Sequence, residues 1–173
     1  MLKIILIVVL IAAILAYAAT RPNQFRVQRA TSIQTPPEKI FPLIADFHNW
    51  TSWSPWEKRD PALKRTYSGA TSGKGARYAW EGNREVGSGR MEITEASSPS
   101  AIRIQLDFIK PFEGHNITDF TLQPAGGATT VTWDMHGPMA FIPKIFGIFV
   151  SMDKMIGKDF EAGLANLKAT AEK

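Results

Sequence analysis

Few residues are candidates for catalysis or metal binding, and their spacing excludes most catalytic and metal-binding motifs. His48, His115 and His136 are the only histidines, and none stands in the HxH or HExxH spacing typical of zinc sites. The chain has no cysteine, which excludes disulfides, thiolate catalysis and Cys-ligated metals. No carboxylate pair and no Ser/His/Asp set can be argued from spacing. We therefore predict no catalytic residue, no metal site and no cofactor.

The acidic residues of the middle of the chain alternate with apolar residues, so we expect them on the outer face of a sheet. The residues in that outward phase are Glu92, Asp107, Asp119 and Asp134. Beside Arg90 and Arg103, such acids normally form weak ion pairs on a solvated surface. Asn116 is in phase with the inward residue Phe120, so it is the polar side chain that we expect inside.

The segment 47–56 holds three of the five tryptophans, spaced three residues apart at Trp50, Trp53 and Trp56. This spacing places the three indoles on one side of a helical turn or a wrapped loop. One interpretation is a hydrophobic plug that closes one end of the core. The other is an aromatic lip on a ligand cavity. Tryptophan suits both, because it buries a large area while its N–H still needs a partner.

The first predicted element of the fold is a strand over 24–34. A helix follows from Thr35, where a cap and two prolines indicate a start, and a second helical piece covers 46–53. Alternating apolar residues and turn signals then predict six strands, over 62–67, 76–81, 86–96, 101–109, 115–123 and 129–136. No strand–helix–strand unit is present, so we predict an α+β fold with an antiparallel sheet.

The last segment, 141–171, is predicted to form one long helix of about 40 Å, because apolar residues recur in steps of three and four. This helix is the only element long enough to cover the apolar face of the sheet. Its first half, 141–156, has ten large apolar residues among sixteen. That half is either fully buried beneath the tryptophan segment, or it forms an apolar mouth that admits a lipid-like ligand or rests on a membrane.

The N-terminal segment 4–19 has sixteen residues without a charge. As a helix it spans about 24 Å, near the short limit for crossing a bilayer core of about 30 Å. It is either an uncleaved anchor or a signal peptide cut near residues 16–18, and we favour the anchor because the apolar run is long for a signal peptide. We expect residues 1–20 to be this segment and 21–173 to be one domain at or beyond a membrane.

Length and composition fit this division. The chain has 173 residues, of which 45% are hydrophobic, enough to build one core. Its net charge of +4 is spread along the chain rather than concentrated in runs, so we expect no nucleic-acid partner.

The element order resembles the START-like helix-grip superfamily, also called SRPBCC, which includes polyketide cyclase/dehydrase and lipid-transport proteins. The resemblance covers 25–172, and it is carried by the segments 33–41, 47–50, 53–56, 153–161 and 163–168, which look like a bacterial subgroup with an N-terminal anchor. It implies a seven-stranded antiparallel curved sheet around a long C-terminal helix, plus an N-terminal transmembrane helix. The superfamily shares no catalytic motif that could be transferred to this chain.

These observations lead to a membrane-tethered domain that binds a small hydrophobic or lipid-like ligand between sheet and helix. The residues expected to line the cavity are mostly aromatic or large and apolar: Trp50, Trp53, Trp56, Tyr78, Trp80, Phe108, Asn116, Trp133, Phe149, Met152 and Ile156. The alternatives are a cyclase or hydratase acting on an apolar substrate, and a protein-interaction or stress-response module using the outer sheet face. We expect a single-pass membrane protein, or a secreted or periplasmic one if the N-terminal segment is cleaved.

Overall fold

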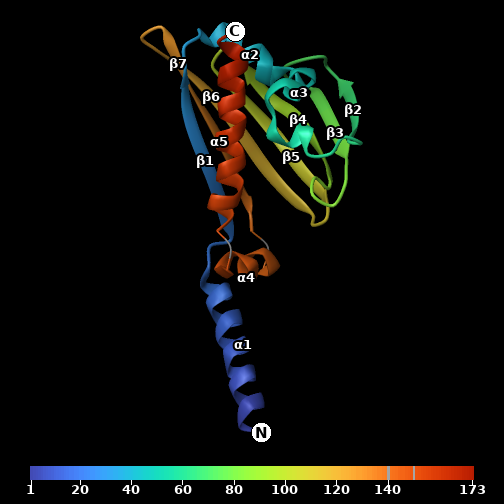
Figure 1. Cartoon of the computed structure of the whole chain (residues 1–173), viewed down its shortest axis with the longest axis vertical. Helices are drawn as coiled ribbons and strands as arrows, with labels where there is room; N and C mark the ends of the chain where they lie inside the picture. Colours follow the sequence, from blue (N-terminus) through green and yellow to red (C-terminus); the bar gives the residue numbers. More distant parts are fainter. Residues whose placement is uncertain (140, 150) are drawn as a thin grey trace.

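A sheet of seven strands forms the body of the molecule (Figure 1). The computed structural model describes residues 1–139, 141–149 and 151–173, apart from the side chains of 142, 146 and 149. The strands are β1 (Gln24–Ile33), β2 (Lys64–Gly69), β3 (Ala76–Glu81), β4 (Ser88–Ser97), β5 (Ala101–Lys110), β6 (Gly114–Ala125) and β7 (Ala128–Pro138).

The strands follow the order β1-β7-β6-β5-β4-β3-β2, and every neighbouring pair is antiparallel. The six consecutive strands therefore form the predicted meander, and β1 closes the far edge by pairing with β7. Buried and exposed residues alternate along β5 and β6, as expected for a sheet with one covered face. The α+β class and the strand count predicted from the sequence are confirmed.

Short helices between β1 and β2 fold over one end of the sheet. They are α2 (Pro37–Ala45), the 3-10 turn η1 (Phe47–Asn49), α3 (Trp50–Trp53) and the 3-10 turn η2 (Pro55–Lys58). Pro37 occupies the first turn of α2, where its missing N–H costs little. The Asp46 side chain accepts a hydrogen bond from the backbone N–H of His48 and so caps η1.

The C-terminal segment forms two helices rather than the single predicted helix. They are α4 (Phe141–Phe149) and α5 (Met152–Ala171), and Figure 1 shows α4 lying across the long axis of α5. The side chain of Ser151 accepts a hydrogen bond from the backbone N–H of Lys154 and caps the start of α5. Asp153 stands in the first turn, where the helix dipole favours an acid. The apolar spacing continues through this point, so periodicity alone concealed the break.

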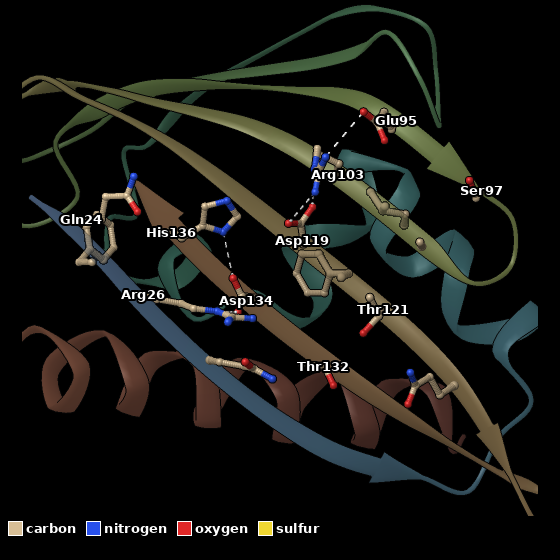
Figure 2. Close-up of a pocket in the computed structure, with 16 residues that line it drawn as sticks. Gln24, Arg26, Glu95, Ser97, Arg103, Asp119, Thr121, Thr132, Asp134 and His136 are labelled. Atoms are coloured by element: carbon tan, nitrogen blue, oxygen red, sulfur yellow. Dashed lines mark hydrogen bonds and ion pairs between the residues drawn. The ribbon is translucent and has the colours of Figure 1, made fainter. Parts of the chain in front are cut away.

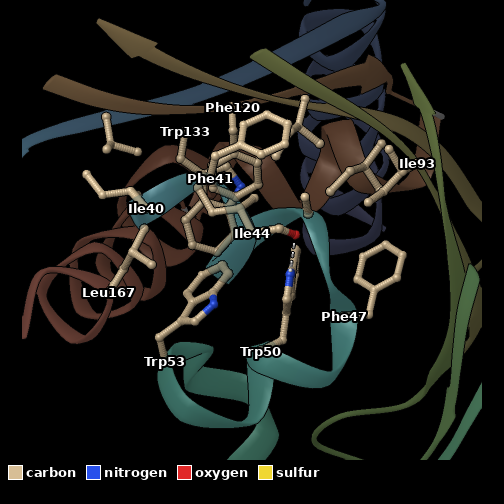
Figure 3. Packing of buried hydrophobic residues seen from close by; sticks show 14 of the residues in the cluster. Ile40, Phe41, Ile44, Phe47, Trp50, Trp53, Ile93, Phe120, Trp133 and Leu167 are labelled. Atoms are coloured by element: carbon tan, nitrogen blue, oxygen red, sulfur yellow. Dashed lines mark hydrogen bonds between the residues drawn. The ribbon is translucent and has the colours of Figure 1, made fainter. Parts of the chain in front are cut away.

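The core lies between the sheet, α5 and the short helices (Figure 3). The C-terminal part of the stripe predicted on the last helix is buried, with Phe160, Leu164 and Leu167 each at most 2% exposed, whereas Met152 and Ile156 are half-buried. Burying a side chain of this size contributes about 1.5–3 kcal/mol relative to leaving it in water. The buried hydrophobic cluster begins at Val27 and includes no residue of the N-terminal helix.

The N-terminal helix α1 (Leu2–Thr20) extends away from the sheet, and only Ala18 of it is buried (Figure 1). Among the described helices, α1 alone is long and apolar enough to cross a membrane, by length and composition. Its C-terminal end packs against α4. The connection to β1 is held there too, because the backbone oxygen of Asn23 accepts a hydrogen bond of 2.8 Å from the N–H of Met139, and its side chain accepts one from Lys144.

Candidate functional site

A cavity of about 920 Å³ lies between the inner face of the sheet and the C-terminal helices. Its walls come from β3 to β7, from α3 and η2, and from the first turns of α5. At one end the lining is formed by the turn between β5 and β6 together with Met139 and Pro143, which places that end beside α4. A volume of this size is in the range of pockets that hold small molecules.

Most of the side chains predicted to line a cavity are brought together around it. Those in its wall are Trp50, Trp56, Tyr78, Trp80, Phe108, Asn116, Trp133, Met152 and Ile156. Strand alternation explains the sheet members, since each lies in the inward phase of its strand.

Of the other two predicted residues, one lies elsewhere and the side chain of the other is not described. Trp53 is fully buried in the core rather than in the cavity wall. Its indole N–H donates a hydrogen bond of 2.8 Å to the backbone oxygen of Leu43, which directs the ring against Phe120 and Trp133. Figure 3 shows it beside Trp50 in this packing. Phe149 ends α4, and its side chain lies outside the part of the chain that the structure describes.

Trp133 is the centre of the aromatic wall. Its ring stacks on Phe160 of α5, with centroids 4.1 Å apart and planes inclined by 9°. Trp56 packs against the same ring in an edge-to-face arrangement, with the ring centroids 5.7 Å apart. The tryptophan segment is therefore divided, because Trp53 is packed in the core while Trp56 lines the cavity.

A buried carboxylate, Glu57, stands in this otherwise largely apolar wall. Its side chain is 6% exposed. Tyr78 donates a hydrogen bond of 2.6 Å from its hydroxyl to Oε1, and Arg65 donates one of 2.6 Å from Nε to Oε2. Burial raises the pKa of Tyr78 well above its ordinary range, and the hydrogen bond to Glu57 raises it further, so the phenol keeps its proton.

Strand alternation could not have identified Glu57, because this residue lies in the η2 turn. The available signal was its position directly after the tryptophan segment, one residue past Trp56 and two past the Pro55 that starts the turn. The partners are 8 and 21 residues away along the chain, which spacing does not reveal.

Some other polar groups at the cavity are paired or lie deep in the wall, whereas those of the β5–β6 turn are exposed. Arg59 and Asp159 form an ion pair between η2 and α5, and both line the cavity. Asn116 is buried on β6 as predicted. Thr118 Oγ1 and Trp133 Nε1 are buried without a hydrogen-bond partner among the described residues.

A second hollow of about 830 Å³ lies on the outer face of the sheet (Figure 2). It is polar, as the outward phase of the acids predicted. Asp119 pairs with Arg103 at 2.8 Å, and Asp134 accepts hydrogen bonds from Arg26 and His136. Potential ligand atoms of Asp119, Asp134 and His136 lie within 4.8 Å of one another. Because both carboxylates already face arginines, this arrangement is better described as a surface ion-pair network than as a metal centre.

Each of the three histidines contacts an aspartate. His48 Nδ1 lies 2.8 Å from Asp46, and His115 Nδ1 lies 2.8 Å from Asp107. The third, His136, belongs to the outer hollow described above. His115 lines the cavity but His48 and His136 do not, so the histidines form no shared site there.

The fold recurs in solved structures of low sequence identity. The protein CV1439 of Chromobacterium violaceum matches with a TM-score of 0.61 and 18% identity, covering 88% of this chain and 99% of that one. The Aha1 dimer of Colwellia psychrerythraea matches with a TM-score of 0.59 and 16% identity, covering 86% of this chain and 96% of that one. The ginseng major latex-like protein 151 of Panax ginseng matches with a TM-score of 0.62 and 10% identity, covering 88% of this chain and 100% of that one.

At these identities the structural likeness establishes the fold alone, and no curated relative matches the chain significantly. The sequence profile of one family, described as polyketide cyclase / dehydrase and lipid transport, matches residues 24–172. This match spans every strand, the short helices, α4 and α5. The family is associated with hydrophobic ligand binding or polyketide cyclase-like activity. The chain therefore belongs to the polyketide cyclase / dehydrase and lipid transport family.

Proposed function

We propose that this protein binds one small apolar or lipid-like molecule in the cavity between the sheet and α5, while α1 tethers it to a membrane. The supporting observation is the cavity of about 920 Å³ with a largely aromatic and aliphatic wall. Removing the apolar surface of a ligand from water at about 25 cal/mol per Å² would supply most of the affinity. The predicted wall residues, Trp56, Trp80 and Phe108 among them, are the proposed contact residues.

The proposed tether is α1, a helix of 19 residues that would span about 28 Å. The proposed division is residues 1–20 for the membrane segment and 21–173 for the binding domain. Support comes from the core, which contains no residue of α1. A domain with its own core folds independently as a rule. If the segment were instead cleaved as a signal sequence, the domain would be released beyond the membrane.

The position of the exposed apolar residues supports loading from the bilayer. Outside α1, the large hydrophobic side chains exposed in the described part of the chain are Ile109, Phe112, Phe141 and Met155. Phe112 and Met155 line the cavity at the end next to α4. Since α1 packs against α4, a membrane-inserted α1 would hold this end of the cavity at the bilayer surface.

Native mass spectrometry of the full chain, incubated with a membrane lipid extract, tests the proposal. We expect a one-to-one complex with a small apolar molecule. The matched variant Leu106→Trp adds bulk at the cavity wall and should retain much less of it. A wild-type protein that stays empty, or a variant that retains as much ligand as the wild type, would contradict the proposal.

The second candidate is an enzyme of the cyclase or hydratase type acting on the bound molecule. Such chemistry needs an acid or base beside the substrate, and Glu57 supplies a carboxylate in the wall. Mass analysis of molecules released after long incubation distinguishes the two candidates. A binding protein returns each molecule unchanged, whereas an enzyme returns a cyclised or hydrated product that is absent with Glu57→Gln.

A further inference from the structure

Glu57, Tyr78 and Arg65 form a hydrogen-bonded polar cluster, called the wall cluster below, in a cavity that is otherwise largely apolar. Arg65 turns its guanidinium toward protein acceptors, with Nε on Glu57 Oε2, Nη2 on the backbone oxygen of Glu57 and Nη1 on that of Leu63. The hydroxyl proton of Tyr78 is committed to Glu57 Oε1. The four hydrogen bonds that Arg65 and Tyr78 donate therefore all go to the protein, and Arg65 itself does not line the cavity.

What the cluster presents to the cavity is acceptor capacity. An ionised carboxylate has about four lone-pair sites, and the described contacts of the Glu57 side chain use two of them. The phenol oxygen of Tyr78 also keeps acceptor sites, and both residues line the cavity. The charge of Glu57 is balanced by Arg65, so the cluster is neutral overall. The cluster can therefore accept hydrogen bonds from a molecule in the cavity, and none of its described hydrogen bonds is donated into the cavity.

We propose that Glu57 receives a hydrogen bond from a hydroxyl or N–H group of the bound molecule, and thereby orients that molecule in the cavity. The inference rests on the proposed ligand-binding function and narrows its ligand class. An apolar molecule with a neutral donor group, such as an alcohol or a phenol, fits the cluster. A carboxylate head does not fit beside Glu57, because it would bring a second negative oxygen against that carboxylate, and the described hydrogen bonds of the cluster direct no donor at it.

The test is a competition among three long-chain probes that differ only in the head group: 1-hexadecanol, its methyl ether and hexadecanoate. The full chain in detergent micelles is incubated with all three in equal amounts, and native mass spectrometry measures which one each protein molecule retains. We expect the wild type to retain the alcohol about tenfold over the ether, the ratio that one hydrogen bond to a charged group provides. Hexadecanoate should be retained no better than the ether.

Glu57→Gln should bring the alcohol-to-ether ratio close to one, because its neutral amide is a weaker acceptor and is already bonded to Arg65. Tyr78→Phe should keep the preference, since it removes only the hydroxyl that competes for the carboxylate. The matched control Glu92→Gln also breaks a glutamate–arginine pair, with Arg77 on the outer sheet face, and should behave like the wild type. Thermal unfolding of each variant establishes that it is folded.

Three results would overturn the inference while leaving ligand binding intact: an equal ratio in wild type and Glu57→Gln, a loss of the preference in Tyr78→Phe, or a preference for hexadecanoate. Retention of none of the probes by the wild type would overturn both the inference and the proposed function. The two failures are thus distinguishable in one measurement.

Discussion

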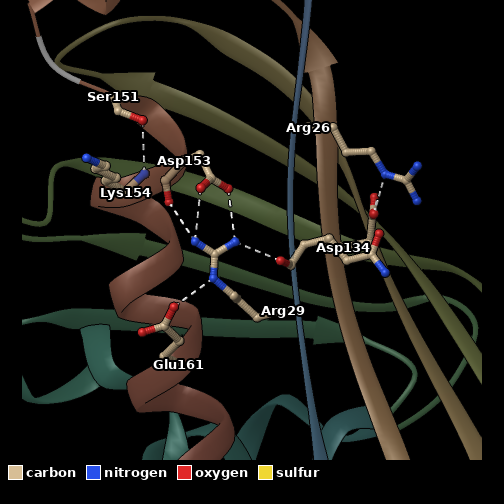
Figure 4. Close-up of polar contacts among 8 residues, drawn as sticks. Arg26, Arg29, Asp134, Ser151, Asp153, Lys154 and Glu161 are labelled. Carbon is tan, nitrogen blue, oxygen red and sulfur yellow. Dashed lines mark hydrogen bonds and ion pairs between the residues drawn. The ribbon is translucent and has the colours of Figure 1, made fainter.

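At the scale of single residues, Gly157 shows why glycine stands inside a long helix. Arg29 of β1 crosses the helix at this point (Figure 4). Its guanidinium binds the Asp153 carboxylate through Nη1 at 2.9 Å and Nη2 at 3.1 Å, and it binds Glu161 through Nε at 2.7 Å. A Cβ on residue 157 would lie 2.5 Å from Arg29 Cζ, so any side chain there would displace the arginine.

The first prediction is a coupling between Gly157→Ala and Arg29→Ala. Alanine in a helix interior is favoured over glycine by about 1 kcal/mol. In the Arg29→Ala background, Gly157→Ala should therefore raise the free energy of unfolding by about that amount. In the wild-type background the gain should disappear or reverse, because the new methyl group displaces the guanidinium. Chemical denaturation of the four proteins measures this coupling, and equal effects of Gly157→Ala in both backgrounds would refute it.

At the scale of elements, the same contacts fix the start of α5 to β1. The first turn of α5 follows directly on the break after α4, so it depends on such contacts for its position. Hydrogen bonding to Arg29 lowers the pKa of Asp153 below its ordinary value of 3.8. A carboxyl group whose pKa is lowered in the folded state stabilises the fold when ionised.

The second prediction concerns how the stability contributed by Asp153 changes with pH. The contribution of Asp153 is fully present above its ordinary pKa and is lost as the pH falls from about 5 through the lowered folded-state pKa. The stability difference between wild type and Asp153→Asn should therefore shrink over this range. Denaturant midpoints at several pH values measure it. The control Glu113→Gln, an exposed carboxylate in the β5–β6 turn, should show no such convergence.

Asp107 does not confound this comparison. Burial alone would raise the pKa of Asp107, but hydrogen bonds from His115, Gln105 and Arg90 outweigh it and lower the pKa overall. This second acid-sensitive contribution is present in both the wild type and Asp153→Asn, so it cancels in their difference. A difference that stays constant from neutral pH to pH 3 would show that the Arg29–Asp153 contact does not stabilise the folded state.

In the molecule as a whole, α1 and α4 lie at the end opposite the β6–β7 turn (Figure 1), and the cavity lining next to α4 includes the turn between β5 and β6. Phe112, at that end, is 67% exposed although it is a large apolar side chain. In the proposed tethered state this exposure is relieved by the bilayer rather than by another part of the chain.

The third prediction uses the absence of native cysteine, which makes any introduced thiol unique. Full-length Phe112→Cys, labelled with an environment-sensitive fluorophore and reconstituted in lipid vesicles, should report an apolar environment. The matched position is Ala125→Cys in the turn between β6 and β7, which is also exposed and lies at the far end. Its label should report water. Identical, water-like emission from both labels would argue against a membrane-facing cavity mouth.

The features that depend on local periodicity could be predicted from the sequence. Alternation with a period of two identified the strands and their inward residues, and steps of three and four identified the buried stripe of α5, because buried faces repeat with the geometry of the element. The same patterns placed Tyr78, Trp80 and Trp133 inside, and an uninterrupted apolar run identified α1.

Which of these side chains contact one another depends on the folded structure and could not be predicted from the sequence. Arg29 and Asp153 are 124 residues apart, and the partners of Glu57 come from two different strands, so no spacing rule relates them. The break before α5 depends on the Ser151 cap, which competes with a periodicity that continues through it. Trp53 and Trp56 share a segment and a residue type, and the structure separates them into core and cavity because packing depends on neighbours brought together in space.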